Sequence, residues 1–304
     1  MRNLIRRILR EQSEVKEIPI KFYMFDWDDN LLYMPTQIYV TTDKGKEIGM
    51  GTEDFAHLRS KLTSGEPFVY KGKTVKGMGE NPFRKFRGGK EEFYKDVEKS
   101  KKAVSWPDLT EAINSGSYLA IITARGHNPQ VIKDTLRDLI NEGSGGISKE
   151  DLLLSLKNRK KLIGQKPLTP KEEINEYIDN CLFYTVGYYY STGSAKPEEI
   201  KAKAMTFFQS SGNDLVDAMN DKLETDGIND YRFKAYFGFS DDDLKNIEFA
   251  KEKTKGIDIF YTGKGEKELV KKGEEGIKPE FKDDLEIQLE NKLRNIIKKI
   301  IIYN

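Results

Sequence analysis

The stretch YMFDWDDNLLYMP, residues 23–35, decides how the rest of the chain is interpreted. The apolar and aromatic run IPIKFYMF at 18–25, which leads into it, predicts a buried strand. Three aspartates follow almost at once: Asp26, Asp28 and Asp29. Carboxylates are poor strand formers, and they cost free energy where water is scarce. We therefore expect these acids to have a role that other parts of the chain must complete.

The composition excludes several classes of site. The 304 residues include 51 basic and 50 acidic ones, so the net charge of +1 argues against a protein that binds nucleic acid through bulk charge. Cys181 is the single cysteine, and His57 and His127 are the only histidines, which excludes a disulfide framework and disfavours a zinc centre. Metal chemistry would therefore depend on carboxylates, which suit a hard cation such as Mg²⁺.

The two ends of the chain have amphipathic patterns. Residues 1–17 and 271–304 place apolar side chains at helical spacing, and the first segment carries arginines on its other side. We favour helices that pack on the protein's own surface over a membrane-surface or targeting segment. No apolar run approaches the ~20 residues that span a bilayer, and we expect a cytoplasmic protein.

Alternating helix and strand patterns predict an α/β fold. Helices are expected from Pro107 to a stop at Gly116, over 128–143 and over 196–212, where Gly212 marks the end. Further strands are expected at 117–126, 181–190, 231–240 and, as the last, 257–265, and helices also at 145–180. This order predicts a Rossmann-like parallel sheet with helices on both faces, built from 18–42 and 104–270. Residues 43–103, with their own helix and glycine-rich turns, look like an inserted α+β segment.

Polar residues follow three of the predicted strands. They are Asp26, Asp28 and Asp29; Thr123 and Arg125; and Asp241, Asp242 and Asp243. In an open α/β sheet the ligand lies at the carboxyl ends of the strands. One such acidic group alone is commonly a turn or a helix cap. Two groups at one edge repel each other unless a cation holds them, and oxygen ligands favour Mg²⁺.

The motifs around these residues resemble those of the haloacid dehalogenase superfamily of phosphohydrolases. FDWDDNLL at 25–32 resembles the first motif, LAIITARG at 119–126 the second and AYFGFSDDDLKNI at 235–247 the fourth, in the family's order. The third motif is a lysine near a helix start, and SAKPEEIKAKAM at 194–205 supplies it. The resemblance implies a catalytic core with 43–103 as a cap over the pocket.

The resemblance also implies a mechanism, that of a Mg²⁺-dependent phosphatase acting on a small phosphorylated substrate. Asp26 is then the nucleophile that becomes an aspartyl phosphate, and Asp28 the acid and base. Thr123 donates its hydroxyl to the phosphoryl group, and the lysine neutralises charge. Asp241 and Asp242 complete a metal site with Asp26 and with Asp28, which in the family binds the metal through its backbone carbonyl.

Several assignments have alternatives. Lys201 is preferred as the third-motif lysine over Lys196 and Lys203, and Asp243 is the alternative metal ligand. Asp29 is interpreted as a turn or cap residue. Asn30 stands where the family has Thr or Val. The further substrate contacts we expect are Arg125, Asn30, Lys196, Arg84 and Arg87.

The basic and aromatic run PFRKFRGGK at 82–90, which contains Arg84 and Arg87, has two interpretations. It either grips a phosphorylated or nucleotide-like substrate or forms a solvated face over an aromatic mini-core. The function also has alternatives: a phosphotransferase or nucleic-acid end phosphatase with the same site, or a non-catalytic binding protein that kept the fold.

Overall fold

A computed structural model of the chain describes residues 15–162, 164–189, 196–263 and 265–273. The amphipathic helices expected at 1–17 and 271–304 fall almost entirely outside these ranges. Where the described residues reach the first of them, Lys16 and Glu17 already belong to a strand. The boundary predicted at residue 18 was therefore late.

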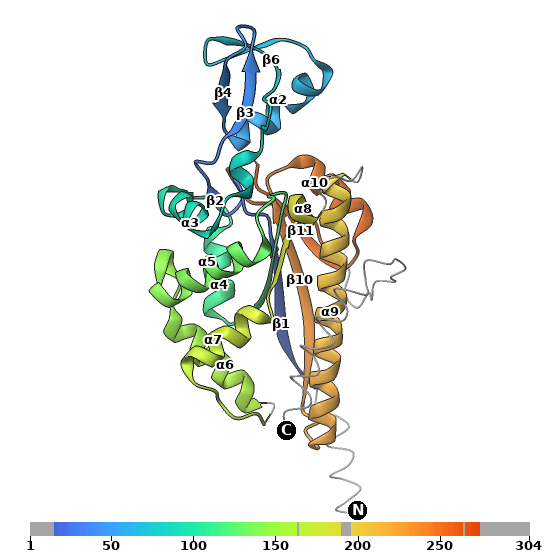
Figure 1. Ribbon diagram of the computed structural model, residues 1–304. Coiled ribbons are helices and arrows are strands. Elements are labelled where there is room, and N and C mark those ends of the chain that lie inside the picture. Colours follow the sequence, from blue (N-terminus) through green and yellow to red (C-terminus); the bar gives the residue numbers. More distant parts are fainter. Residues whose placement is uncertain (1–14, 163, 190–195, 264, 274–304) are drawn as a thin grey trace, which may run out of the picture.

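The main body is built on a six-stranded sheet with the order β12-β11-β10-β1-β8-β9 (Figure 1). Neighbouring strands are parallel except β12, which is antiparallel to β11. The strands are β1 (Lys16–Phe25), β8 (Tyr118–Thr123), β9 (Leu182–Thr185), β10 (Tyr231–Asp241), β11 (Ile257–Tyr261) and β12 (Glu268–Lys271). The chain is thus a mixed α/β protein with a mostly parallel sheet, as predicted. The expectation that β11 is the last strand was wrong, because a short charged edge strand without clear alternation follows it.

Helices cover both faces of this sheet (Figure 1). On β1, Phe25 packs in one hydrophobic cluster, and Phe22 and Met24 pack in another, as the period of two along a strand requires. The first cluster includes α4 (Trp106–Asn114), α5 (Pro129–Glu142), α6 (Lys149–Leu162) and α7 (Pro170–Asp179). The second includes α9 (Pro197–Thr225) and α10 (Leu244–Lys253). The sheet is therefore buried on both sides, which explains its nearly continuous apolar strands.

Two expectations around α9 were wrong. The helix does not stop at Gly212 but continues to Thr225. A Cβ at Gly212 would lie 2.8 Å from ring carbons of both Phe22 and Phe237, so this glycine allows close packing of helix on sheet rather than ending the helix. The strand expected at 181–190 ends at Thr185, and α8 (Val186–Tyr189) follows as a single helical turn.

A second, antiparallel sheet interrupts the main body after β1. Its order is β4-β3-β6-β5. Its elements are β3 (Ile38–Thr42), β4 (Glu47–Met50), α2 (Thr52–Ser64), β5 (Phe68–Tyr70) and β6 (Lys73–Met78). Val40, Met50 and Val75 lie in its separate hydrophobic core. Figure 1 shows this unit above the carboxyl ends of the main strands.

The insertion is shorter than the predicted range 43–103. It begins with β3 at Ile38, because β3 pairs with β4 and β6 and not with the main sheet. The elements after it are a 3₁₀ turn (Arg84–Arg87), α3 (Lys90–Lys99) and β7 (Lys101–Lys102), which pairs with β2 (Leu32–Tyr33). Phe93 of α3 is buried in the main core. The small sheet unit therefore comprises residues 38–78, and α3 belongs to the main body.

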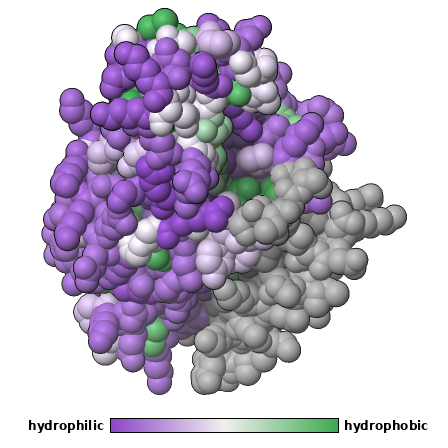
Figure 2. Space-filling view, turned by 45° about the horizontal axis from the view of Figure 1, so that its top comes forward, coloured by the Kyte–Doolittle hydropathy of each residue, from purple (hydrophilic) through white to green (hydrophobic). Residues whose placement is uncertain are grey.

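Within the described residues, no helix combines the length and apolar character needed to cross a membrane. On the part of the face that is coloured by hydropathy, Figure 2 shows mostly hydrophilic residues, with hydrophobic ones in small separate groups.

Candidate functional site

The switch point of the main sheet lies at β1. From β1 the chain goes to β8 and β9 on one side, then crosses through α9 to β10 on the other side. Such a reversal opens a crevice at the carboxyl ends of the strands. Asp26, Thr123 and Asp241 are the residues at or directly after the ends of β1, β8 and β10. The fold therefore brings the separate sequence motifs to one edge.

Lys201 joins two of these strand ends. Its Nζ lies 2.7 Å from Asp26 Oδ1 and 2.7 Å from Asp241 Oδ2, and its side chain is 3% exposed. It lies one turn after Pro197, where α9 begins, so the helix directs it inward. Lys196 and Lys203 are exposed. Of the three lysines considered, Lys201 is the one that reaches the carboxylates. The substrate contact expected for Lys196 stays a prediction.

Asp26, Asp241 and Asp242 form a group that could hold a metal ion. One carboxylate oxygen from each lies within 4.8 Å of the others. The Asp28 carboxylate is not in the group, and metal binding by the Asp28 backbone carbonyl stays a prediction. Asp243 is not in it either, because its carboxylate caps α10 by accepting the Lys245 N–H at 2.8 Å. Of the two alternatives for the fourth motif, the adjacent pair Asp241 and Asp242 is the one that gathers here.

The three acids differ in how many of their oxygens are already in use. Both Asp241 oxygens accept from Asn246 Nδ2 at 3.0 Å, one also accepts the Asp243 N–H, and the other pairs with Lys201. Asp26 Oδ2 and the Asp242 carboxylate have no hydrogen-bond donor among the residues the structure describes. Mg²⁺ in proteins is commonly held by one or two carboxylates together with water and phosphate. The residues therefore fit Mg²⁺, with Asp26 and Asp242 as the available ligands.

The electrostatics of the group favour a cation. The pKa of Asp26 is raised to about 8, chiefly by burial; Lys201 lowers this pKa, while the Asp241 and Asp28 carboxylates raise it. Burial and the neighbouring Asp241 and Asp26 also hold the pKa of Asp242 well above its usual range. Burial lowers the pKa of Lys201, but Asp241 and Asp26 outweigh it and raise that pKa. One lysine thus faces three carboxylates, and a bound cation would relieve the excess negative charge.

Asp28 and Arg125 form a buried ion pair. Arg125 Nε and Nη2 donate to the two Asp28 oxygens at 2.7 and 2.5 Å, and the Arg125 side chain is 1% exposed. Nη2 also donates to Thr36 Oγ1 at 3.0 Å, and the guanidinium lies 4.8 Å from the Phe86 ring centroid and 5.2 Å from that of Phe93. Arg125, expected to contact substrate, is instead enclosed by the protein. Asp28 is correspondingly directed at Arg125 and not at the metal-binding group.

Asn30 is a structural residue, which corrects its expected substrate contact. Its side chain is fully buried. Its Nδ2 donates to Asp26 O and Ser240 Oγ at 3.1 Å, and its Oδ1 accepts from Ser105 Oγ and Thr262 Oγ1 at 2.9 Å. All four of its hydrogen-bonding positions are used, so none is left for a ligand. Asn30 ties the end of β1 to β10, to the start of α4 and to the end of β11.

Asp29 is a turn residue, as interpreted from the sequence. Its φ of 54° lies in the left-handed region, and its N–H donates to Leu32 O at 2.9 Å. Burial raises the pKa of Asp29 to about 6, against a hydrogen bond with Thr52 that lowers it. Thr123 is 1% exposed, and its Oγ1 accepts the Arg125 N–H at 3.3 Å.

The basic run at 82–90 is mostly neutralised within the protein. Arg84 pairs with Glu47 at 3.0 Å, and its guanidinium lies 3.3 Å from the Tyr39 ring centroid, so this side chain is already engaged within the protein. Lys85 and Lys90 have ion pairs with Glu92 and Asp138. Arg87 is exposed and has no such partner within the described ranges. Of the arginines expected to contact substrate, Arg87 is the one that remains available.

An open groove of about 890 Å³ leads to Asp242 from between α2 and α10. His57 of the small sheet unit lines it, together with Lys245 and Phe249 of α10 and with Tyr261. His127, by contrast, is 2% exposed, and burial with Arg125 nearby lowers its pKa to about 3. The insertion thus contributes to the approach to the acidic group.

Some residues of the site were not foreseen. Asn246 follows Asp241 by five positions on the next helix, a spacing that would have indicated a contact. Thr36, Ser105 and Thr262 had no local signal, because their partners are distant in sequence.

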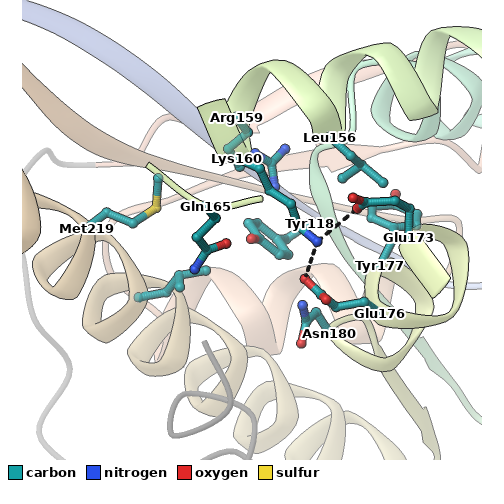
Figure 3. A pocket seen from close by; sticks show the side chains of 11 residues that line it. Tyr118, Leu156, Arg159, Lys160, Gln165, Glu173, Glu176, Tyr177, Asn180 and Met219 are labelled. Atoms are coloured by element: carbon teal, nitrogen blue, oxygen red, sulfur yellow. Dashed lines mark ion pairs between the residues drawn. The ribbon is translucent and has the colours of Figure 1, made fainter. Parts of the chain in front are cut away.

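A second buried lysine, on α6, lies near the opposite end of the sheet (Figures 1 and 3). Lys160 of α6 pairs with Glu173 at 3.0 Å and Glu176 at 3.1 Å, both on α7. They border a small cavity of about 40 Å³ beside Tyr118, the first residue of β8. This cavity is far from the strand ends that carry Asp26, so it is separate from the site described above.

Comparisons of the chain with protein-family models, with curated proteins and with solved structures gave no match.

Proposed function

We propose that this protein is a Mg²⁺-dependent phosphatase of the haloacid dehalogenase type, which hydrolyses a phosphomonoester through an aspartyl-phosphate intermediate. The observation that carries the proposal is the group formed by Asp26, Lys201, Asp241 and Asp242 at the switch point of the sheet. Three motifs far apart in the sequence supply its members, and its negative charge exceeds the single lysine. Perturbed carboxylates gathered at such a crevice are typical of catalytic sites.

In the first step, an Asp26 oxygen attacks phosphorus, and the bond from phosphorus to the leaving oxygen breaks. The leaving oxygen takes a proton from the Asp28 carboxyl group, so an alcohol departs. In the second step, Asp28 accepts a proton from water as the water oxygen attacks phosphorus. The phosphorus–Asp26 bond then breaks, which regenerates the Asp26 carboxylate and releases phosphate.

The other residues position and neutralise the reacting groups. Asp26 and Asp242 would hold Mg²⁺, which when bound offsets phosphate and carboxylate charge. Lys201 holds Asp26 in place and balances part of its charge. Thr123 would donate its hydroxyl to a phosphoryl oxygen. The small sheet unit would act as a cap, since His57 and the groove place it at the approach to Asp242.

Asp28 must exchange its partner for this mechanism to operate. Its carboxylate is bound by Arg125 on both oxygens. For the first step Asp28 has to turn toward the leaving oxygen. This pair is also the observation that favours a second function, a metal- or phosphate-binding protein without turnover.

The test is hydrolysis of p-nitrophenyl phosphate and a panel of small phosphomonoesters with Mg²⁺, compared with Asp26→Asn. We expect phosphate release by the wild type and a loss of at least about 10³-fold in the variant, because no other group replaces the nucleophile. Asp243→Asn is the matched control, since the Asp243 carboxylate caps α10 and an asparagine side chain accepts the same hydrogen bond. Mg²⁺ binding without any phosphate release would support the second function. Undiminished activity in Asp26→Asn would overturn the nucleophile assignment.

A further inference from the structure

The carboxyl edge of the sheet continues past the acidic group to β8 and β9. Tyr188 and Tyr189 lie in α8, directly after β9, and Thr185 at the end of β9 is paired with Thr123 of β8. Adjacent strands are about 4.8 Å apart, so β9 lies roughly 10 Å from β1 along this edge. The proposed mechanism leaves both tyrosines unused, although a phosphate at Asp26 would lie within a small molecule's length of β9.

The two tyrosine rings are half-exposed, yet they are held in place. Tyr189 stacks on the buried Tyr184 with ring centroids 5.0 Å apart, and Tyr188 meets Tyr189 edge-on at 5.3 Å. Asn128 Nδ2 donates to Tyr188 Oη at 3.4 Å. Tyr188 and Tyr189 are 46% and 49% exposed. A fixed aromatic surface of this kind binds a flat ring with little loss of side-chain entropy.

Close glycine contacts connect this surface to the loop after β8. A Cβ at Gly187 would lie 2.9 Å from Ala124 O, and the Gly187 N–H donates to Arg125 O at 3.0 Å. A Cβ at Gly126 would lie 2.9 Å from Cγ of Arg87, so Arg87 lies against the same loop. The loop that follows Thr123 therefore contacts both α8 and Arg87.

Arg87 supplies a single positive charge at this place. It is exposed and has no hydrogen bond or ion pair within the described residues, whereas the other basic residues of the run at 82–90 are paired. A guanidinium is well suited to a phosphate oxygen. Proteins that bind polynucleotides use several such cations along the backbone. One available arginine, in a chain of net charge +1, suits a small singly phosphorylated ligand.

On the basis of the proposed phosphatase function, we propose that Tyr188, Tyr189 and Arg87 form a subsite for a mononucleotide. The base stacks on one of the two tyrosine rings and meets the other edge-on, because the rings stand at 88° to each other. Arg87 pairs with the phosphate that Asp26 attacks. The substrate class is thus a nucleoside monophosphate, and these residues determine specificity.

The test compares kcat/KM for adenosine 5′-monophosphate and for glycerol phosphate in wild type and in the double variant Tyr188→Ala/Tyr189→Ala. We expect the ratio of the two values to fall about 10-fold through KM for the nucleotide, because stacking on aromatic side chains is lost. Arg87→Ala is expected to raise KM for both substrates. Tyr231→Ala, which removes an equally exposed tyrosine at the start of β10, is the control and leaves the ratio unchanged.

Equal losses for both substrates in the tyrosine variant, or the same change in Tyr231→Ala, would overturn the subsite. A tenfold preference of the wild type for a 5′-phosphorylated oligonucleotide over adenosine 5′-monophosphate would overturn the mononucleotide assignment. Calorimetric binding of adenosine 5′-monophosphate to Asp26→Asn, with and without the tyrosines, tests the subsite without turnover. If wild type hydrolyses neither phosphate while this binding depends on the tyrosines, the phosphatase proposal fails and the subsite stands.

Discussion

Lys201 and Lys160 are both buried lysines that pair with two carboxylates, and they lie near opposite ends of the main sheet. Lys201 holds Asp26 and Asp241 at 2.7 Å, at the carboxyl ends of β1 and β10. Lys160 holds Glu173 and Glu176 at 3.0 and 3.1 Å, beside the start of β8 (Figure 3). In pairwise geometry the two arrangements are alike.

They differ in how the charges balance. Asp242 adds a third carboxylate beside Lys201 and has no donor in the described part of the chain. At the other end Lys160 faces only two glutamates, the Glu176 side chain is 41% exposed to water, and Arg159 lines the same cavity. A buried ion pair alone is weak evidence for function, since structural pairs are common. The excess of buried negative charge is what distinguishes the candidate site.

The largest expected effect separates the two lysines by activity. Lys201→Met should lower phosphatase kcat/KM by about 10²–10³-fold, because a buried charge at the reacting group is lost. Lys160→Met should leave kcat/KM within about twofold and lower stability instead, because Glu173 is left buried without its partner. Turnover of p-nitrophenyl phosphate and urea unfolding measure the two quantities. Similar activity losses in both variants would contradict the comparison.

Metal binding should stabilise the protein through the acidic group beside Lys201 and not through the glutamates beside Lys160. At a Mg²⁺ concentration of 100 times Kd, the free energy of unfolding should rise by about 2.7 kcal/mol relative to the protein in a chelator. Asp242→Asn should remove most of this gain, since Asp242 offers a carboxylate without a competing donor. Glu176→Gln should retain it. Thermal unfolding with and without Mg²⁺ measures the effect, and an equal gain in Asp242→Asn would exclude Asp242 as a ligand.

The pH dependence of stability should reveal the carboxylate excess. The pKa of Asp26 is raised from 3.8 to about 8 in the metal-free fold, so the folded state binds this proton more tightly. Stability from this group is present below pH ~4 and is lost as the pH rises through 8. His127, with its pKa lowered to about 3, acts in the opposite direction only below its ordinary 6.5. Between pH 6.5 and 8 the free energy of unfolding should therefore fall, by at most about 2 kcal/mol per proton.

Urea unfolding in a chelator at these two pH values measures that fall. Asp26→Asn should reduce it, and saturating Mg²⁺ should abolish it, because the ion binds the deprotonated carboxylates. Glu173→Gln, at the balanced end, should leave the fall unchanged. A fall of the same size in Asp26→Asn would assign the effect to another group.

The smallest expected effect concerns the partly exposed ion pair between Lys160 and Glu176. Glu176→Gln should change the free energy of unfolding by no more than about 0.5 kcal/mol, because a partly solvated ion pair contributes little. The change should shrink further at 1 M salt, where exposed charges are screened. A loss of several kcal/mol would show that this end of the sheet depends on the pair as strongly as the other depends on Lys201.

The sequence predicted those parts of the molecule that depend on local patterns. The alternation in β1, the paired acids after β10 and the lysine one turn into α9 are all readable from spacing. The convergence of Asp26, Lys201 and Asp241 also followed, because carboxyl ends of parallel strands meet at one edge. The insertion was found, although its ends were misplaced by the aromatic run around Phe86 and Phe93, which packs into the main body.

Local patterns were thus enough for the α/β class, the order of its elements and the side chains that gather at the switch point. The roles of Asn30, Arg125 and Gly212 needed the folded chain. The side-chain hydrogen-bond partners of Asn30 are separated from it by 75, 210 and 232 positions in the sequence. Asp28 and Arg125, which form an ion pair, are 97 positions apart. The hydrophobic period and the residues that start a helix are patterns of a few neighbouring residues, so they can be recognised in the sequence. Which polar group satisfies which buried partner depends on long-range packing, and a single side chain carries no sign of it.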